Sequence, residues 1–387
     1  MVLTFTVLVF SVKGAWNMSF LADSLLIKNM KLRNRLALPA LTTNYGNTHG
    51  EVTGKTLDFY RKRSCHVGLV VVEAAAVRAD GRIAPGNLGL WEKNQISGMA
   101  CLVEIIKAQG AVAVIQLNHA GSRCTPNDGK FTGASPSGFR FRPDVEPLVL
   151  NKAHIRELVE NFADAATRAI EAGFDGVEIH GAHFCIISQF LSPLTNKRQD
   201  CYGGDIKGRA KLALEIISAV RERIGPNLAL LFRLNGVEMV EGGQTHEDAV
   251  ELSRLLADSG VDILDISIIT NSFWCEENGK SYLVASSALP QNVPPGFNIE
   301  VTESIRNASN IPVIVVGKMA DEFALSEVLR GPKADIIAVG RQMIADPHTA
   351  EKLLGSQFKE IIKCKECMSC FETIGRGLPM RCPFENY

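Results

Sequence analysis

The sequence has no excess of charge of either sign. Its 387 residues include 41 lysines and arginines against 42 aspartates and glutamates, which gives a formal net charge of −1. This balance offers no general attraction to DNA, RNA or an anionic membrane, although a few local cations would be enough to bind one phosphate group. We therefore expect a small-molecule substrate and no nucleic-acid or membrane partner, and we leave a homo-oligomer open.

A long hydrophobic run is also missing. The one candidate, VLTFTVLVFSV at residues 2–12, is too short to span a bilayer. No Lys or Arg precedes it and no A-x-A cleavage pattern follows it, so it matches a signal peptide poorly. We interpret residues 1–19 as an N-terminal tail, with Met18 as a candidate natural start, and we expect a cytoplasmic protein.

No low-complexity stretch, long linker or block of charge interrupts the rest of the chain. The length is normal for an α/β barrel with extra loops, and 46% hydrophobic residues are enough to bury a large core without disulfide bonds. We predict one domain over residues 20–355, followed by a cysteine-rich segment over residues 356–387.

Short apolar runs alternate with helical patterns along this domain. The runs are mostly Val, Ile, Leu and Ala without strict polar alternation, which is typical of parallel strands buried on both faces. The predicted strands are residues 35–41, 69–73, 112–117, 176–180, 228–234, 263–267, 312–317 and 336–340. The predicted helices between them include residues 95–109, 151–173, 208–223, 245–259, 300–308 and 321–330.

Eight strand–helix units in series predict an α/β fold, a single (β/α)8 TIM barrel. A doubly wound open sheet is the competing fold, but it would usually show a Gly-rich turn after its first strand, and none is present. In a barrel, catalytic residues lie at the carboxyl ends of the strands. His180 and His183 stand at the end of the fourth predicted strand, and both could donate N–H groups to one substrate oxygen. Two satisfied histidines, or a metal pair, are the alternatives.

The two histidines stand in a longer motif, IHGAHFCIISQFLSPLTNKRQDCYGG, at residues 179–204. It resembles the old yellow enzyme family of flavin-dependent ene-reductases, whose pattern is close to H-x-A-H/N-G-Y…QFLSP…N-R-x-D-x-YGG. The resemblance extends from about residue 25 to the end of the sequence. It implies a barrel that binds FMN and uses NAD(P)H as co-substrate, with His180 and His183 holding the oxygen of the substrate.

The resemblance also implies which residues contact the flavin. Thr42, after the first strand, would lie close to the flavin ring and tune its potential, and the small Ala75 in VVVEAAAV would let the ring approach. Gln116 in VIQLNHAGSR would hydrogen-bond the pyrimidine edge, because one amide offers both a donor and an acceptor. Arg233 in FRLN would lie beside N1 and O2 and stabilise the reduced anion.

A phosphate site can be predicted from the last two strands themselves. Each ends in Gly plus a cation, Gly317-Lys318 and Gly340-Arg341. Barrels commonly bind phosphate with the loops after strands seven and eight. The glycines would let backbone N–H groups approach the phosphate, Arg341 would bind it bidentately, and Lys318 would add charge.

Cys185 stands where the family usually has a Tyr that protonates the substrate α-carbon. A thiol can donate a proton and its ordinary pKa is below that of Tyr, but its reach is shorter. We therefore consider Cys185 as a candidate acid, with a packed thiol as the alternative.

Four cysteines crowd the C-terminal segment. Cys364, Cys367 and Cys370 are spaced C-x2-C-x2-C, and Cys382-Pro383 follows, which is similar to ferredoxin-type cluster motifs. The segment resembles the tail of the 2,4-dienoyl-CoA reductase branch, which binds a 4Fe–4S cluster and has one more residue between its second and third cysteines. Free thiols and a zinc site are the alternatives. Since the sequence ends at Tyr387, we expect the FAD and NAD(P)H domains of those longer enzymes to be absent.

These observations predict an FMN-dependent oxidoreductase that passes hydride from NAD(P)H through the flavin to an activated alkene, an enone or a related electrophile. Two other classes stay open. One is a flavin-binding electron-transfer protein or pseudo-enzyme, and the other is an amine-type dehydrogenase.

Overall fold

The computed structural model describes residues 19–124, 133–277, 279–286 and 291–384. Nearly all of the predicted N-terminal tail, residues 1–19, therefore lies outside the described residues. Among the residues that are described, no helix is long and apolar enough to cross a membrane.

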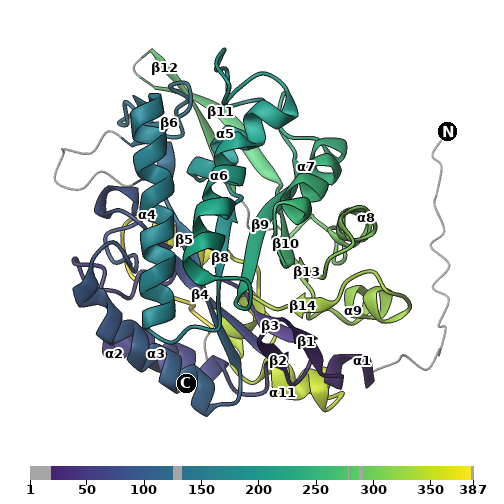
Figure 1. The fold of residues 1–387 in the computed structure, drawn as a ribbon. Coiled ribbons are helices and arrows are strands. Elements are labelled where there is room, and N and C mark those ends of the chain that lie inside the picture. Colours follow the sequence, from purple (N-terminus) through teal and green to yellow (C-terminus); the bar gives the residue numbers. More distant parts are fainter. Residues whose placement is uncertain (1–18, 125–132, 278, 287–290, 385–387) are drawn as a thin grey trace, which may run out of the picture.

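A closed barrel of eight parallel strands forms the centre of the molecule (Figure 1), so the predicted TIM barrel is confirmed. Every predicted strand overlaps an observed one, in the predicted order. The barrel strands are β3 (Leu36–Leu38), β4 (Leu69–Ala76), β5 (Val112–Asn118), β8 (Gly176–Gly181), β9 (Ala229–Glu238), β10 (Ile263–Ile269), β13 (Val313–Val316) and β14 (Ile336–Ala338).

The apolar runs form buried strands because successive side chains fill two different cores. On β4, Leu69 and Val71 belong to the core inside the barrel, whereas Val70 and Val72 pack outward in the larger core between strands and helices. Both faces of each strand must therefore be apolar, which is why the sequence shows no polar alternation here.

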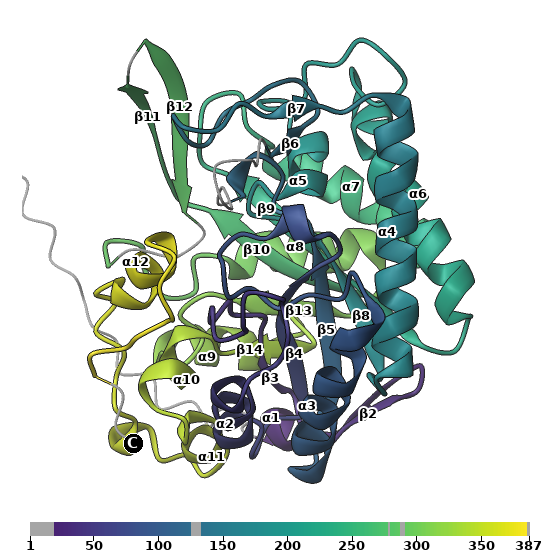
Figure 2. The same ribbon diagram turned by 90° about the vertical axis from the view of Figure 1, so that its left-hand side faces the viewer.

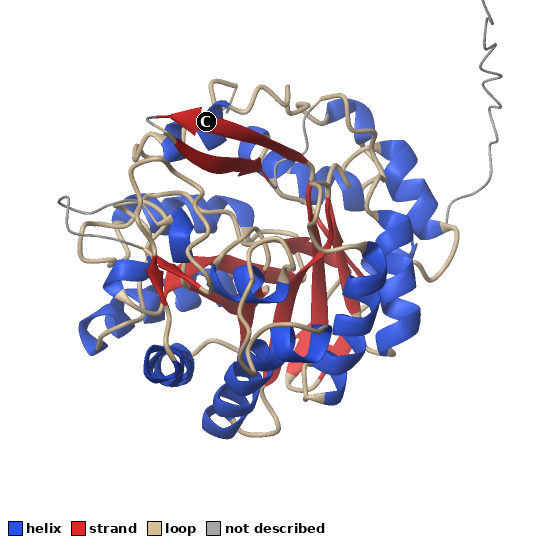
Figure 3. Ribbon diagram, turned by 90° about the horizontal axis from the view of Figure 1, so that it is seen from above, coloured by secondary structure: helices blue, strands red, loops and turns tan. Residues whose placement is uncertain are grey.

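Helices surround the barrel, as the view along its axis shows (Figure 3). The principal ones are α2 (Gly54–Arg63), α3 (Ile96–Ala108), α4 (Lys152–Glu171), α6 (Ile206–Ile224), α7 (His246–Asp258), α8 (Ile299–Ser309) and α9 (Glu322–Leu329). Local signals set their ends: the Asn151 side chain accepts from two backbone N–H groups at the start of α4, and Gly173 adopts φ 93° after its end. The shorter helices are α1 (Ser19–Ala22), α5 (Ile186–Leu191), α10 (Arg341–Ala345), α11 (Thr349–Leu354) and α12 (Ser369–Gly375).

In the described part of the chain, three small two-stranded sheets lie outside the barrel: β1 (Leu25–Ile27) with β2 (Met30–Leu32), β6 (Ala134–Ser135) with β7 (Leu148–Val149), and β11 (Asn271–Glu277) with β12 (Lys280–Ser286). The β11–β12 hairpin leaves the carboxyl end of β10 and projects beyond the barrel (Figure 2). The segment with α12 lies on the same side of the molecule as this hairpin. The hairpin and the C-terminal segment thus both border the end of the barrel where chemistry is expected.

Candidate active site

A deep cleft of about 1310 Å³ opens at the carboxyl ends of the barrel strands. Its wall is built by loops after the strands, by β12 and by the C-terminal segment. Of the site residues predicted from the sequence, twelve line the cleft: Thr42, Gln116, His180, His183, Cys185, Arg233, Gly317, Lys318, Gly340, Arg341, Cys364 and Cys370. Ala75, Cys367 and Cys382 do not line it.

His180 and His183 lie edge to face in the cleft, with their ring centroids 4.9 Å apart. Burial lowers the pKa of both imidazoles well below the ordinary value, and the neighbouring cations Arg233 and Arg123 lower it further. Both rings are therefore neutral at pH 7, and each carries one N–H group. His183 Nε2 lies 2.6 Å from Ser267 Oγ, and its backbone N–H donates to Asn235.

Arg123 lies next to the histidines and connects the third strand's loop to the hairpin. Its guanidinium donates to the carbonyl of His183 and, over 3.2 Å, to the carbonyl of Ala285 on β12. Its positive charge also interacts electrostatically with Cys185, whose thiol is buried in the cleft wall. Burial raises the pKa of Cys185 to about 11, although Arg123 and Asn118 oppose that shift. The thiol is thus protonated at pH 7 and carries a proton that it can donate.

Gln116 and Arg233 reach the cleft from β5 and β9, and each is held by a carboxyl group deeper in the barrel. Gln116 Nε2 donates to Glu178 Oε1 over 2.7 Å, and Arg233 Nε lies 3.3 Å from Asp265 Oδ2. Arg233 also donates to the carbonyl of Ala40, over 3.3 Å. A fixed amide and a fixed cation therefore face the same cavity.

The structure places Ala75 away from the cleft. Ala75 is fully buried in the outer core, and its neighbour Ala74 lines the cleft instead. The reason is an irregularity in the pairing of β4 with β5 between Val72 and Ala75, which changes the side-chain alternation. A small residue does line the cleft at the end of this strand, but it is one position earlier.

Thr42 is held by a buried network behind it. The next residue, Thr43, donates to the Glu73 carboxylate through its backbone N–H (2.8 Å) and its hydroxyl (2.5 Å). The hydroxyl of Tyr60 accepts from the backbone N–H of Glu73 over 2.7 Å. Burial raises the pKa of Glu73 to about 7, even though the hydrogen bonds from Thr43 favour the charged carboxylate.

The two cations after strands seven and eight lie in the cleft wall and contact the C-terminal segment. Lys318 Nζ lies 2.7 Å from Glu366 and donates to the carbonyl of Val293 over 2.6 Å. Arg341 donates to the sulfur of Met368 over 3.2 Å. Gly317 adopts φ 118°, which only glycine adopts readily, so the turn before Lys318 depends on it.

The four C-terminal cysteines gather near one another but are not arranged as ligands. Burial, together with smaller contributions from the other three thiols, raises the pKa of the Cys370 thiol to about 11, although Arg341 opposes the shift. Within the described part of the chain, no three His, Cys, Asp or Glu side chains converge closely enough to hold a metal ion. The donor set suits a soft metal, whereas its geometry in this structure is that of separate thiols.

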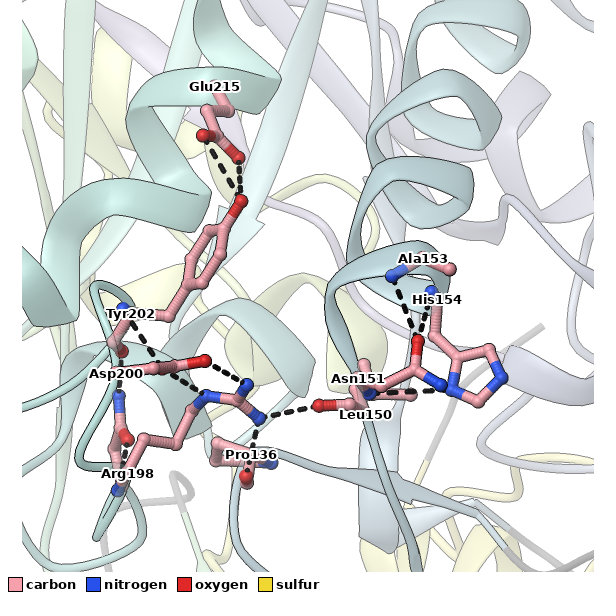
Figure 4. Close-up of polar contacts among 10 residues, drawn as sticks. Pro136, Leu150, Asn151, Ala153, His154, Arg198, Asp200, Tyr202 and Glu215 are labelled. Atoms are coloured by element: carbon pink, nitrogen blue, oxygen red, sulfur yellow. Dashed lines mark hydrogen bonds and ion pairs between the residues drawn. The ribbon is translucent and has the colours of Figure 1, made fainter.

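The second half of the 179–204 motif builds a support for the cleft rather than its wall (Figure 4). Arg198 forms a bidentate pair with Asp200, at 2.9 and 2.7 Å, and donates to the carbonyls of Pro136 and Leu150. The Tyr202 hydroxyl donates to Glu215 on α6. These contacts tie the loop after α5 to the segments before α4 and to α6.

Several cleft residues were not predicted as site residues. Asn118, Arg123 and Ser267 line the cleft, and Glu178 and Asp265 lie behind it. A signal was available for the last two, because each is a single carboxylate within an otherwise apolar strand, GVEIH and ILDIS. A buried charge of this kind requires a partner or a function.

Comparison with known proteins identifies the family. Residues 22–358 match the family model described as the NADH:flavin oxidoreductase / NADH oxidase family. An NADH oxidase of Thermoanaerobacter brockii is 33% identical over 364 residues, which cover 92% of this chain and 54% of that protein. The chain thus spans about half the length of that relative. An NADPH dehydrogenase of Halalkalibacterium halodurans is 35% identical over 333 residues, which cover 85% of this chain and 92% of the relative.

Solved structures agree with this match. A morphinone reductase in complex with tetrahydroNAD is 27% identical, with a TM-score of 0.71 over 87% of this chain and 90% of that one. A 2-naphthoyl-CoA reductase shares the fold with a TM-score of 0.85 at 24% identity, over 94% of this chain and 56% of that one. The chain belongs to the NADH:flavin oxidoreductase / NADH oxidase family, the family of the old yellow enzymes.

Proposed function

We propose that this chain is an FMN-dependent oxidoreductase that passes hydride from NAD(P)H through the flavin to an activated alkene, an enone or a related electrophile. The observation that carries the proposal is the pair of neutral histidines, His180 and His183, in a cleft that also presents Gln116 and Arg233. Family membership supports the flavin and the nicotinamide donor.

The residues of the cleft fit FMN. The cleft is larger than the roughly 300–1,000 Å³ of ordinary ligand pockets, so it has room for a flavin and a second molecule. His180 Nδ1 is buried without a hydrogen-bond partner in the described part of the chain, which supports a ligand at this place. Thr42, Gln116 and Arg233 would hold the ring, and Arg341 with Lys318 would hold the phosphate. When bound, FMN supplies two-electron redox chemistry.

The protein's own groups would act on the substrate. His180 and His183 donate N–H groups to one carbonyl or nitro oxygen, and this polarises the adjacent double bond. Because both rings are neutral, they stabilise developing negative charge without giving up a proton. Cys185 is protonated at pH 7 and would deliver a proton to the α-carbon.

The His180→Ala variant tests the proposal. We expect it to retain FMN and to lose roughly 100-fold or more in the rate of enone reduction, because one donor to the oxygen is removed. Stopped-flow spectroscopy with NAD(P)H and then an enone separates the two half-reactions. Undiminished enone reduction in this variant would contradict the assignment. Reduction of the flavin only by a protein donor or an amine would favour the electron-transfer or amine-dehydrogenase alternative.

We also propose that Cys364, Cys367, Cys370 and Cys382 bind a metal centre, with a 4Fe–4S cluster as the first choice. The support is the cysteine spacing and the mutual influence of the four thiols. Iron and sulfide analysis of anaerobically purified protein tests this proposal, and absence of both iron and zinc would leave free thiols. A cytoplasmic location and a homo-oligomer stay predictions.

A further inference from the structure

Four polar side chains form a layer inside the barrel, directly behind the cleft. They are Gln116 on β5, Glu178 on β8, Arg233 on β9 and Asp265 on β10, and we call them the buried polar layer. Gln116 is the register partner of Glu178, and Asp265 is the partner of Arg233. Gln116 and Arg233 face the cleft, whereas Glu178 and Asp265 are both 0% exposed and do not line it.

The charges of this layer do not balance. It contains two carboxyl groups and one guanidinium, and Arg233 pairs with Asp265 over 3.3 Å. Among the described residues, Glu178 Oε2 and both carboxyl oxygens of Asp265 have no hydrogen-bond partner. An uncompensated charge at a dry site costs several kcal/mol, so such a group takes up a proton instead. With two carboxylates and one guanidinium, the layer would carry one uncompensated negative charge. We therefore expect the two carboxyl groups together to bind one proton.

The electrostatic surroundings of Glu178 point the same way. Burial and, to a lesser degree, the Asp265 carboxylate raise its pKa to about 8, against the opposing influence of Arg233 and of the hydrogen bond from Gln116. The pKa of Asp265 is also raised, mainly by burial and against the influence of Arg233. The nearby His180 is neutral and adds no charge.

We propose that Glu178 is a positioning residue of the flavin site: Glu178 and Asp265 together hold one proton, and Glu178 binds a proton from solvent when the bound cofactor is reduced in alkaline solution. This inference rests on the proposed function, because it requires FMN next to Arg233. Two electrons then add negative charge beside Arg233. The guanidinium is drawn toward that charge and compensates the carboxyl groups less, so a Glu178 carboxylate accepts one proton from water. No other bond in the layer forms or breaks.

The test is the pH dependence of the flavin midpoint potential, measured on the full-length holoprotein and on Glu178→Gln. Glutamine keeps the shape and the hydrogen-bonding contact with Gln116 but cannot titrate. In the unchanged protein we expect proton uptake to rise from one to two protons per two electrons as the pH passes through about 8. In the variant we expect one proton per two electrons on both sides of that pH.

Glu238→Gln is the matched control. Glu238 is also fully buried with a pKa raised to about 7 by burial, but it bonds Ser192 and Asn235 outside the buried polar layer. This variant should keep the rise in proton uptake. A rise that persists in Glu178→Gln, or one that is lost equally in the control, would overturn the proposal.

Infrared difference spectra of the unchanged protein keep the proposal testable if Glu178→Gln fails to fold. Reduction at pH 9 should create a carboxylic-acid carbonyl band that shifts in D₂O. FMN bound with no such band and no rise in proton uptake would overturn this inference alone. Failure to bind FMN would overturn the proposed function as well.

Discussion

His180 and His183 show how surrounding charge selects the chemistry of a side chain. Desolvation and two nearby guanidiniums, Arg233 and Arg123, keep both imidazoles neutral. A protonated histidine would act as an acid toward the substrate oxygen, whereas a neutral one acts as a hydrogen-bond donor only. In the proposed reaction the proton for the substrate carbon would therefore come from another group, and Cys185 in the cleft wall is the candidate.

The Cys185→Ala variant should separate the proton step from the hydride steps. We expect reduction of the flavin by NAD(P)H to be unchanged and turnover with an enone to fall on the order of 100-fold, because a general acid is lost. Steady-state and single-turnover rates measure the two effects.

Cys124→Ala provides the matched control for that prediction. Burial likewise raises the pKa of the Cys124 thiol to about 11, but Cys124 does not line the cleft. The Cys124→Ala variant should leave turnover with an enone unchanged. Equal turnover in both variants would mean that Cys185 is a packed thiol and that water or another residue donates the proton.

The position of a single residue in the cleft could be predicted where the residue stands near the end of a regular barrel strand. Gln116 and Arg233 were expected at the flavin from the family resemblance, and both stand near strand ends, where the site of a barrel lies. The position of Ala75 could not be predicted, because the β4 irregularity that turns it outward depends on pairing with β5 and leaves no mark in the sequence. The layer partners Glu178 and Asp265 were missed because the apolar pattern around them indicated only strands.

The barrel strands and helices could be predicted from the sequence more completely than the segments that connect them. All eight barrel strands and the six predicted helices were found, because hydrophobic periodicity reports buried faces directly. The β11–β12 hairpin was missed, although Asn278-Gly279 is a strong hairpin signal in the sequence. It stands outside the barrel repeat, so the repeat pattern gave no reason to expect strands there.

Arg198 should matter for the stability of the elements around the cleft. A lysine cannot reproduce its bidentate pair with Asp200 and its bonds to the carbonyls of Pro136 and Leu150. We expect Arg198→Lys to lower the free energy of unfolding by about 2–3 kcal/mol, as judged by urea denaturation.

Arg142→Lys is the control for this change. Arg142 forms the same two-residue bidentate pair with Asp144, but its side chain is 35% exposed. The Arg142→Lys variant should lower the free energy of unfolding by less than about 1 kcal/mol. A loss in Arg198→Lys no larger than in this control would show that the carbonyl contacts contribute little.

At the scale of the whole molecule, buried carboxyl groups should make stability fall in alkaline solution. Burial raises the pKa of Glu73 to about 7, of Glu178 to about 8 and of Glu238 to about 7, from an ordinary value of 4.5. The folded protein therefore binds more protons than the unfolded chain over this range. The free energy of unfolding must then decrease as the pH rises, until the folded-state pKa values are passed.

The window from pH 6.5 to 8.5 covers most of this effect. The buried histidines have lowered pKa values, so they add stability as the pH rises through the unfolded-chain value of 6.5, and they offset part of the loss in the lower half of the window. We expect a loss on the order of 2 kcal/mol across the window, measured by urea denaturation at constant FMN content. Equal or greater stability at pH 8.5 would contradict the assignment of protonated buried carboxyl groups.

The central claim is that the cleft holds FMN and uses it to move hydride. The most direct measurement is the visible spectrum of anaerobically purified protein, reconstituted with FMN and followed through addition of NAD(P)H and then an enone. We expect flavin absorption in a one-to-one complex, loss of that absorption with NAD(P)H, and its return with the enone. A protein that binds no FMN after reconstitution, or whose flavin NAD(P)H does not reduce, would contradict it.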